Sequence, residues 1–418
     1  MNAPEKYVPV DPRLPDFERE AAGLLAEVVG GNPDSVADAE RWLARHTTPA
    51  RFGLDDARAA TAAAYGYPNW DRLVDACAVC AAVRADDPER LAHLIAARPE
   101  LLRENARGTA RCNWGPPLSY AANLGCDRAL EWLLDHGAPD IDHAFDRACL
   151  QGRIPTARLL HARGARPRPG AVMGPAETQD AAGMEYLLSI GAEIADAEGD
   201  PWAPVGLLLE TYCRDAEGRG RCLDLFAKRG VVLPDSPVMD FLRRRWDALD
   251  ARLDADPGLA GRTFAHAEIW PPQLGCHADP VFALHGTPLA GTTLLHLAVD
   301  FDELEFLARW LRRGLDPDPR AAIDAEGFGG HTPLFGTVVS QACATRVRRD
   351  GAGAELLLEH GARPNVRASL RKRLLFHDDE TEHVYRNVTP VGWGNSFHGR
   401  NWVDAAALAK IVAAGGVD

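Results

Sequence analysis

The sequence predicts an all-α solenoid, in which similar helix pairs are stacked along the chain. The main observation is a short ending that occurs seven times in 418 residues: two or three large apolar residues, a polar or charged pair, and a glycine. A glycine directly after a helix adopts the left-handed conformation that side chains oppose, so each copy predicts a helix end. The copies are 132–138, 159–165, 186–192, 225–231, 309–315, 356–362 and 410–416. Repetition of one ending indicates repetition of one structural unit.

Matching helix starts lie upstream of some of these endings. They are the segments 115–121, 291–298, 330–337 and 387–393. In two of them, Thr332 and Thr389 stand where an N-cap accepts a backbone N–H. Pro333 and Pro390 follow at the first helical position, where a missing N–H costs nothing. Paired starts and ends predict helix–turn–helix units.

These starts and endings resemble the ankyrin repeat, whose consensus begins G-x-T-P-L-H-x-A and ends L-L-L-x-x-G-A. The units 115–138 and 330–362 match at both ends, and 291–315 matches closely at its start and loosely at its end. The units that end at Ala165 and Ala192 have degenerate starts, and 199–231 matches only at its end. The resemblance implies antiparallel helix pairs joined by short hairpin loops, and a role in binding other macromolecules.

Residues 1–75 predict a helical leader and N-terminal cap. Two amphipathic helices are expected between about Phe17 and His46, with a break at 30–33, where Gly and Pro interrupt the helical pattern. The following segment, with Tyr65, Tyr67 and Trp70, is similar to a leader found ahead of many bacterial ankyrin arrays. Its aromatic residues are of the kind that covers the open core of a first repeat. The chain is therefore identified as an ankyrin-repeat protein of bacterial type.

A second repetition divides the repeats into two arrays. The segments 89–101 and 247–259 align at a constant offset, and each is a helical pattern halted by a proline, Pro99 or Pro257. This is the usual form of the first unit of such an array. We therefore expect a first array over 76–234 and a second over 235–418. Whether the two arrays join into one arc is left open by the sequence.

The second array carries two long irregular segments, at about 260–290 and 366–387. The later one mixes the basic run 371–373 with the acidic run 378–380 and alternates apolar and charged residues, which predicts a β-hairpin. Loops of this length usually bind a ligand or pack against the body of the protein. The segment 366–387 is therefore predicted to form part of the partner or ligand site.

Composition excludes several classes of protein. The chain is 46% hydrophobic and 25% charged, which is typical of a globular protein, and its net charge of −14 would repel a nucleic acid. No apolar run is long enough to span a bilayer, and the start lacks a signal-peptide pattern. Most of its nine cysteines are scattered singly, which suits a reducing compartment. These features predict a cytoplasmic protein that binds neither nucleic acid nor membranes.

The histidines leave two interpretations open. Nine of the fourteen lie between 266 and 398, and two of them flank an acidic run, so a metal site or an acid–base centre is one interpretation. The other, which we favour, is a solvated or partner-binding loop, because no structural metal signature has this spacing. The weak catalytic candidates are His377, Asp378, Asp379, His383 and His296. No cofactor and no metal site is predicted.

The function predicted from these patterns is recognition of a protein or peptide through the concave face and the long loops. The acidic balance favours a basic partner. The expected binding residues are Trp114, Tyr120, His331, Phe335, Arg371, Arg373, Tyr385, Trp393 and His398. Trp114, Phe335 and Trp393 should be exposed at or beside helix starts, and the alternative for Trp393 is packing under the C-terminal cap. The alternative is an enzyme or small-molecule binder with a site near the junction of the two arrays, built from His and acidic residues of the second array.

Overall fold

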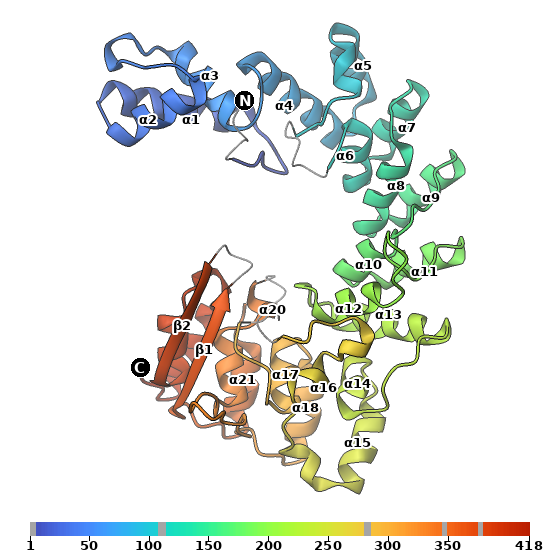
Figure 1. Ribbon diagram of the computed structural model, residues 1–418, viewed down its shortest axis with the longest axis vertical. Helices are drawn as coiled ribbons and strands as arrows, with labels where there is room; N and C mark the ends of the chain where they lie inside the picture. The colour runs from blue at the N-terminus through green and yellow to red at the C-terminus, as the bar shows by residue number, and fades with distance from the viewer. Residues whose placement is uncertain (1–5, 108–113, 280–285, 345–348, 375–378) are drawn as a thin grey trace. The chain divides into compact units, whose positions relative to one another are not determined.

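The computed structural model describes residues 6–107, 114–279, 286–344, 349–374 and 379–418. By its internal contacts the chain divides into two compact units, residues 1–168 and 169–418. Both units are built mainly of short helices that follow one another in pairs (Figure 1). The predicted all-α fold of repeated helix pairs is confirmed.

The first unit contains nine α-helices among its described residues. They are α1 (Leu14–Val29), α2 (Pro33–Leu43), α3 (Leu54–Ala64), α4 (Trp70–Arg84), α5 (Pro88–Ala97), α6 (Pro117–Leu124), α7 (Asp127–Asp135), α8 (Ile141–Leu150) and α9 (Ile154–Ala162). Helices α4, α6 and α8 pack in series, and α5 packs against α7. First helices of successive pairs therefore stack on one another, as a solenoid requires.

The second unit repeats this arrangement and adds a two-stranded sheet. Its described elements are α10 (Met173–Thr178), α11 (Ala181–Ser189), α12 (Ala203–Glu210), α13 (Ala216–Lys228), α14 (Pro237–Leu242), α15 (Trp246–Ala255), α16 (His266–Ile269), α17 (Leu294–Asp300), α18 (Leu304–Arg312), α19 (Pro333–Val338), α20 (Gln341–Ala344), α21 (Ala352–Glu359), β1 (Ala368–Leu374), β2 (Asp379–Val388), α22 (Pro390–Ser396) and α23 (Ala405–Ala413). Helices α17, α19 and α22 pack in series, as do α18, α21 and α23.

The repeated glycine endings close helices as predicted. All seven glycines have a positive φ, between 75° at Gly137 and 109° at Gly164. In the first copy, the N–H of Ala138 bonds the carbonyl of Leu133 at 3.0 Å, which satisfies a carbonyl at the helix end. Leu133 and its counterpart Leu357 are fully buried. The ending thus stops the helix and supplies the core of the repeat at once.

Five of the six proline and threonine signals were right, and Pro333 and Pro390 begin α19 and α22 as expected. Helix α5 ends before Pro99 and α15 ends before Pro257, and a 3₁₀ turn begins at each proline. The hydroxyl of Thr389 caps α22 by accepting from a backbone N–H, as expected. The expected cap at Thr332 is wrong, because its hydroxyl is buried without a hydrogen-bond partner among the described residues.

The expected leader region contains two helices at the expected places, α1 and α2, with a break over residues 30–32. Helix α3 packs against both of them. The aromatic residues Tyr67 and Trp70 lie in one apolar cluster with Phe17 of α1, which joins this bundle to α4. Its role as a cap stays a prediction.

The division after residue 168 differs in place from the expected boundary near residue 234. The two boundaries describe different properties, because one separates compact units and the other separates arrays of repeats. The arrays at 76–234 and 235–418 therefore stay a prediction. None of the described helices combines the length and the apolar character needed to cross a bilayer.

Candidate functional site

The predicted hairpin in the second unit is confirmed, and β1 pairs with β2 in antiparallel register. Residues opposite one another on paired strands share a face of the sheet, so the register assigns each side chain to one of two faces. We call the face with the pairs Leu370–Tyr385 and Lys372–His383 the inner face, and the face with Arg371–Val384 and Arg373–Glu382 the outer face.

Aromatic packing holds the inner face against the repeats. The Tyr385 ring lies edge-on to Trp393 of α22, with ring centroids 4.8 Å apart, and its hydroxyl accepts a hydrogen bond of 3.0 Å from the N–H of His398. The rings of His383 and His398 stack at 4.0 Å. Desolvation lowers the pKa of Lys372 to about 8, and nearby Asp300 opposes that shift. The inner face of the hairpin is thus held by ring packing and by a hydrogen bond.

Backbone and side-chain contacts also join the hairpin to the preceding repeat. The N–H of Gly329 donates to the carbonyl of Ser369 at 2.7 Å, so the 323–329 turn continues the sheet beside β1. Arg371 donates to Asp324 at 2.7 Å and pairs with Glu326. The hairpin is therefore tied to the turn that precedes α19.

The outer face combines arginines with one exposed apolar side chain. The guanidinium groups of Arg371 and Arg386 lie 4.6 and 4.4 Å from the ring centroid of Phe328 and cover it. Val384 is 48% exposed, and Arg373 and Arg386 are exposed as well. Planar guanidinium groups beside an apolar side chain are typical of protein interfaces.

The histidine and acid candidates are only partly within the described structure. His377 and Asp378 lie outside the described residues, and so does the side chain of Asp379. Within the described ranges, no group of three or more His, Cys, Asp or Glu side chains is placed to hold a metal ion. The catalytic roles of these residues stay predictions.

His296 and His331 are buried in neighbouring repeats. His296 Nδ1 lies 3.0 Å from the hydroxyl of Thr293, and its Nε2 lies 3.1 Å from the carbonyl of His331. His331 Nε2 lies 2.9 Å from the carbonyl of Pro288. Burial lowers the pKa of His296 well below its usual value and lowers that of His331 to about 4. Both rings link repeats as neutral groups and are closed off from solvent.

The expected exposure is wrong for Phe335, and Trp393 follows the alternative in which it is packed inside the protein. Tyr120, Phe335 and Trp393 have no exposed surface. The hydroxyl of Tyr120 donates to the carbonyl of Val10, and the indole N–H of Trp393 donates to the hydroxyl of Thr287. Inner helices of stacked repeats press against one another, and this packing covers residues at helix starts.

Trp114 in the first unit keeps part of its surface. Two arginines lie near its ring, with the guanidinium carbons of Arg107 and Arg147 at 4.7 and 5.8 Å from the ring centroid. Arg147 donates to the side chain of Asn123 at 2.9 Å. Of the expected binding residues, Trp114 in the first unit and those of the hairpin in the second unit keep accessible surface.

Buried ion pairs join the two expected arrays on either side of residues 234–237. Arg219 of α13 and Glu303, which precedes α18, pair at 2.5 Å and are 0% and 1% exposed at their side chains. Arg214 and Asp300 pair at 3.1 Å. The guanidinium carbons of Arg214 and Arg219 lie 4.5 and 4.8 Å from the ring centroid of Phe301. These charges neutralise one another inside the protein, so the alternative of a catalytic site at this junction gains no support from them.

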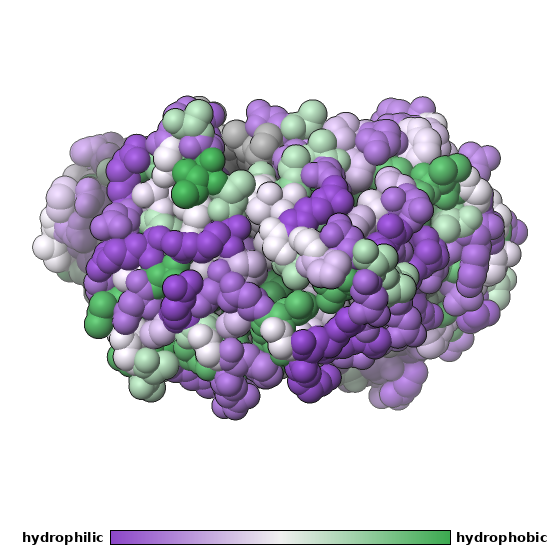
Figure 2. All heavy atoms as spheres, turned by 90° about the horizontal axis from the view of Figure 1, so that it is seen from below, coloured by the Kyte–Doolittle hydropathy of each residue, from purple (hydrophilic) through white to green (hydrophobic). Residues whose placement is uncertain are grey.

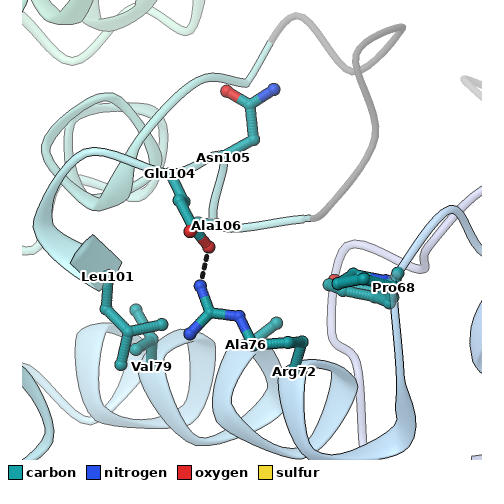
Figure 3. Close-up of a pocket in the computed structure, with 9 residues that line it drawn as sticks. Pro68, Arg72, Ala76, Val79, Leu101, Glu104, Asn105 and Ala106 are labelled. Atoms are coloured by element: carbon teal, nitrogen blue, oxygen red, sulfur yellow. Dashed lines mark hydrogen bonds and ion pairs between the residues drawn. The ribbon is translucent and has the colours of Figure 1, made fainter. Parts of the chain in front are cut away.

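A cavity of about 320 Å³ lies in the first unit between α4 and the turn after α5. Arg72 extends from α4 toward Glu104, with Leu101 and Val79 beside it (Figure 3). The guanidinium of Arg72 also lies 3.4 Å from Glu100 and 3.6 Å from Asp75. Three carboxylates already neutralise this cation, so the cavity does not favour an anionic ligand.

On the face that Figure 2 shows, hydrophobic side chains form small groups separated by polar ones. A partner on that face would therefore rely on single anchors and not on one wide apolar patch.

Comparisons with known proteins give little further guidance. No protein-family model matches the chain, and no curated protein matches it. The crystal structure of the human ASB11 ankyrin repeat domain is similar at 16% identity, over 72% of this chain and 99% of that chain, with a TM-score of 0.27. The repeat fold described here follows from the chain's own stacked helix pairs and repeated glycine endings, and not from that likeness.

Proposed function

We propose that the protein binds another protein or a peptide, and that the outer face of the hairpin forms part of the binding surface. The observation that carries the proposal is the combination on that face of exposed Val384 with the arginines Arg373 and Arg386. An apolar side chain can anchor a partner, and arginines around it can bind carbonyl and carboxylate groups of that partner.

The fixed position of the hairpin supports this proposal. Contacts of Tyr385 on the inner face, and the hydrogen bond between Gly329 and Ser369, hold the strands before any partner arrives. A surface that is ordered in advance loses little conformational entropy on binding, so more of the contact energy appears as affinity. The insertion thus has the properties of a recognition element.

The net charge of −14 favours a partner that is basic as a whole, while the arginines of the outer face call for carbonyl or carboxylate groups in the segment that touches them. We also propose a cytoplasmic location in a bacterium. The cysteines in the described part of the chain are all free, which agrees with a reducing compartment.

The test begins by placing a photo-crosslinking amino acid at position 384 in the native cell and identifying the attached protein. The binding of that purified protein is then measured with the natural chain, with Val384→Asp and with Val232→Asp. Val232 is 81% exposed in a loop of the same unit and serves as the matched control. We expect Val384→Asp to weaken binding at least tenfold, which is the size of a hot-spot loss of about 1.4 kcal/mol or more.

Equal affinities of the two variants would place the binding surface elsewhere. Thermal unfolding of both variants, compared with the natural chain, shows whether they are folded.

A further inference from the structure

A second cavity, of about 330 Å³, lies among the three helices of residues 14–64. Small residues of α1 and α3 make room for it, namely Gly23, Ala60 and Ala64. A side chain added at Gly23 would meet nothing within 4 Å, which shows how open this position is. The cavity belongs to the first unit and has no part in the hairpin.

The lining of this cavity carries an excess of negative charge. It includes the carboxylates of Glu20, Glu27 and Asp38 and one cation, Lys6. Glu27 accepts a hydrogen bond of 2.6 Å from Ser35. Asp38 is exposed, and the described residues provide no partner for it. With one cation for three carboxylates, the lining keeps a net negative charge that attracts a further cation.

A buried hydroxyl in the lining is also unused. Thr61 of α3 is 3% exposed, and its Oγ1 has no hydrogen-bond partner among the described residues. Buried polar groups are nearly always satisfied by protein, water or ligand. A ligand with N–H donors would satisfy this acceptor.

The chain itself shows which chemical group this environment accepts. The Lys6 ammonium pairs with Glu20 and lies 5.8 Å from the ring centroid of Tyr65, whose hydroxyl donates to Glu20 at 2.9 Å. Beside the cavity, the guanidinium of Arg41 lies 5.2 Å from the ring centroid of Trp42. Carboxylates and aromatic faces together are typical of sites for organic cations.

We propose that this cavity binds a basic side chain, preferably arginine, of a partner polypeptide. The planar guanidinium carries five N–H donors, which suit a lining that offers the carboxylates of Glu27 and Asp38 and the hydroxyl of Thr61 as acceptors, and its flat face suits the ring of Trp42. Lysine offers fewer directed donors and is more strongly hydrated. This site is independent of the hairpin and does not require that the outer face binds anything.

The test uses the full-length chain and the blocked tripeptide acetyl-Gly-Arg-Gly-amide, with the neutral citrulline analogue as its partner. Binding is followed by the NMR signal of the Trp42 indole N–H, which is assigned with Trp42→Phe. We expect a saturable shift with the arginine peptide at millimolar concentration, weaker binding of the citrulline peptide, and loss of affinity as salt is added.

The double variant Glu27→Gln/Asp38→Asn should weaken binding of the arginine peptide about three- to thirtyfold, as expected for two partly exposed ion pairs. The matched control is Glu18→Gln/Asp55→Asn, which removes the same charge from exposed positions of α1 and α3 outside the lining and should leave affinity unchanged. Lys6→Ala should tighten binding, because it removes the cation that already occupies part of the cavity.

Several results would overturn the proposal: equal affinity for the two peptides, equal effects of the two double variants, or binding that is not tightened by Lys6→Ala. Val384→Asp should leave binding of the tripeptide unchanged. A failure of the hairpin proposal and a failure of this one can therefore be told apart.

Discussion

Replacement of Glu303 by alanine should destabilise the second unit strongly. Glu303 pairs with Arg219 at 2.5 Å and with Arg244 at 3.1 Å, and its side chain is 1% exposed. Burial raises its pKa and lowers the pKa of Arg219 to about 10, so the protein interior disfavours both charges unless they are paired. Without Glu303, Arg219 keeps a buried charge and loses its partner.

The loss of one member of a buried ion pair costs about 3–5 kcal/mol. Glu305 provides the matched control, because it pairs with Arg244 at 2.8 Å and is 65% exposed, and an exposed pair contributes about 0–1 kcal/mol. The free energy of unfolding is measured in urea for Glu303→Ala and Glu305→Ala. We also expect Arg219→Met/Glu303→Leu to recover most of the loss, since apolar side chains of similar size can replace a buried pair.

A cost for Glu303→Ala no larger than that for Glu305→Ala would refute this reasoning. The pair also crosses the expected boundary near residue 234, so residues 169–418 should unfold in one transition. Separate transitions for 169–234 and 235–418 would show that the pair does not couple the two segments.

Two other predictions concern the repeats. Leu357→Ala should lower the free energy of unfolding by about 2–5 kcal/mol in a denaturant titration, and by clearly more than Leu358→Ala, because Leu357 is fully buried and Leu358 only partly. An unchanged midpoint for Leu357→Ala would contradict the packing described here. Burial lowers the pKa of His331 from 6.5 to about 4, and the charge of Arg320 adds to this shift. The ring of His296 lies beside it. Between about pH 4 and pH 6.5, His331 therefore takes up a proton only in the unfolded chain. Stability should therefore fall as pH drops from about 6.5 to about 4, by about 3 kcal/mol from this group, and His331→Gln should remove that part of the slope in unfolding titrations across this range. A slope that His331→Gln leaves unchanged would show that this ring is not held neutral.

Local signals in the sequence predicted much of the fold. Glycine after an apolar run marks helix ends such as Gly137, and Pro99 and Pro257 mark the ends of α5 and α15. The alternation over 366–387 predicted the hairpin. Each of these features depends on residues that are close in the sequence, so one sequence is enough to find them.

Features that depend on distant residues were missed. Arg219 and Glu303 are far apart in the sequence, and neither carries a motif that identifies its partner. Arg244 belongs to the basic run 243–245, and nothing in that run shows that Arg244 pairs with Glu303 and Glu305. Phe335 was expected at the surface because its helix start was recognised, but the neighbouring repeat that covers it could not be placed from the sequence. The cavity near Thr61 was missed because three helices form it together.

The hydrogen bond between Gly329 and Ser369 implies that binding at the hairpin would also stabilise the interface between two repeats. In a solenoid each repeat interacts mainly with its neighbours, so stability depends on the interfaces between successive repeats. A ligand that touched both Arg386 and the 323–329 turn would hold two repeats together, and its binding energy would add to the interface between them. Amide hydrogen exchange in α19 and α21 should then slow when the outer face is occupied, although neither helix belongs to that face.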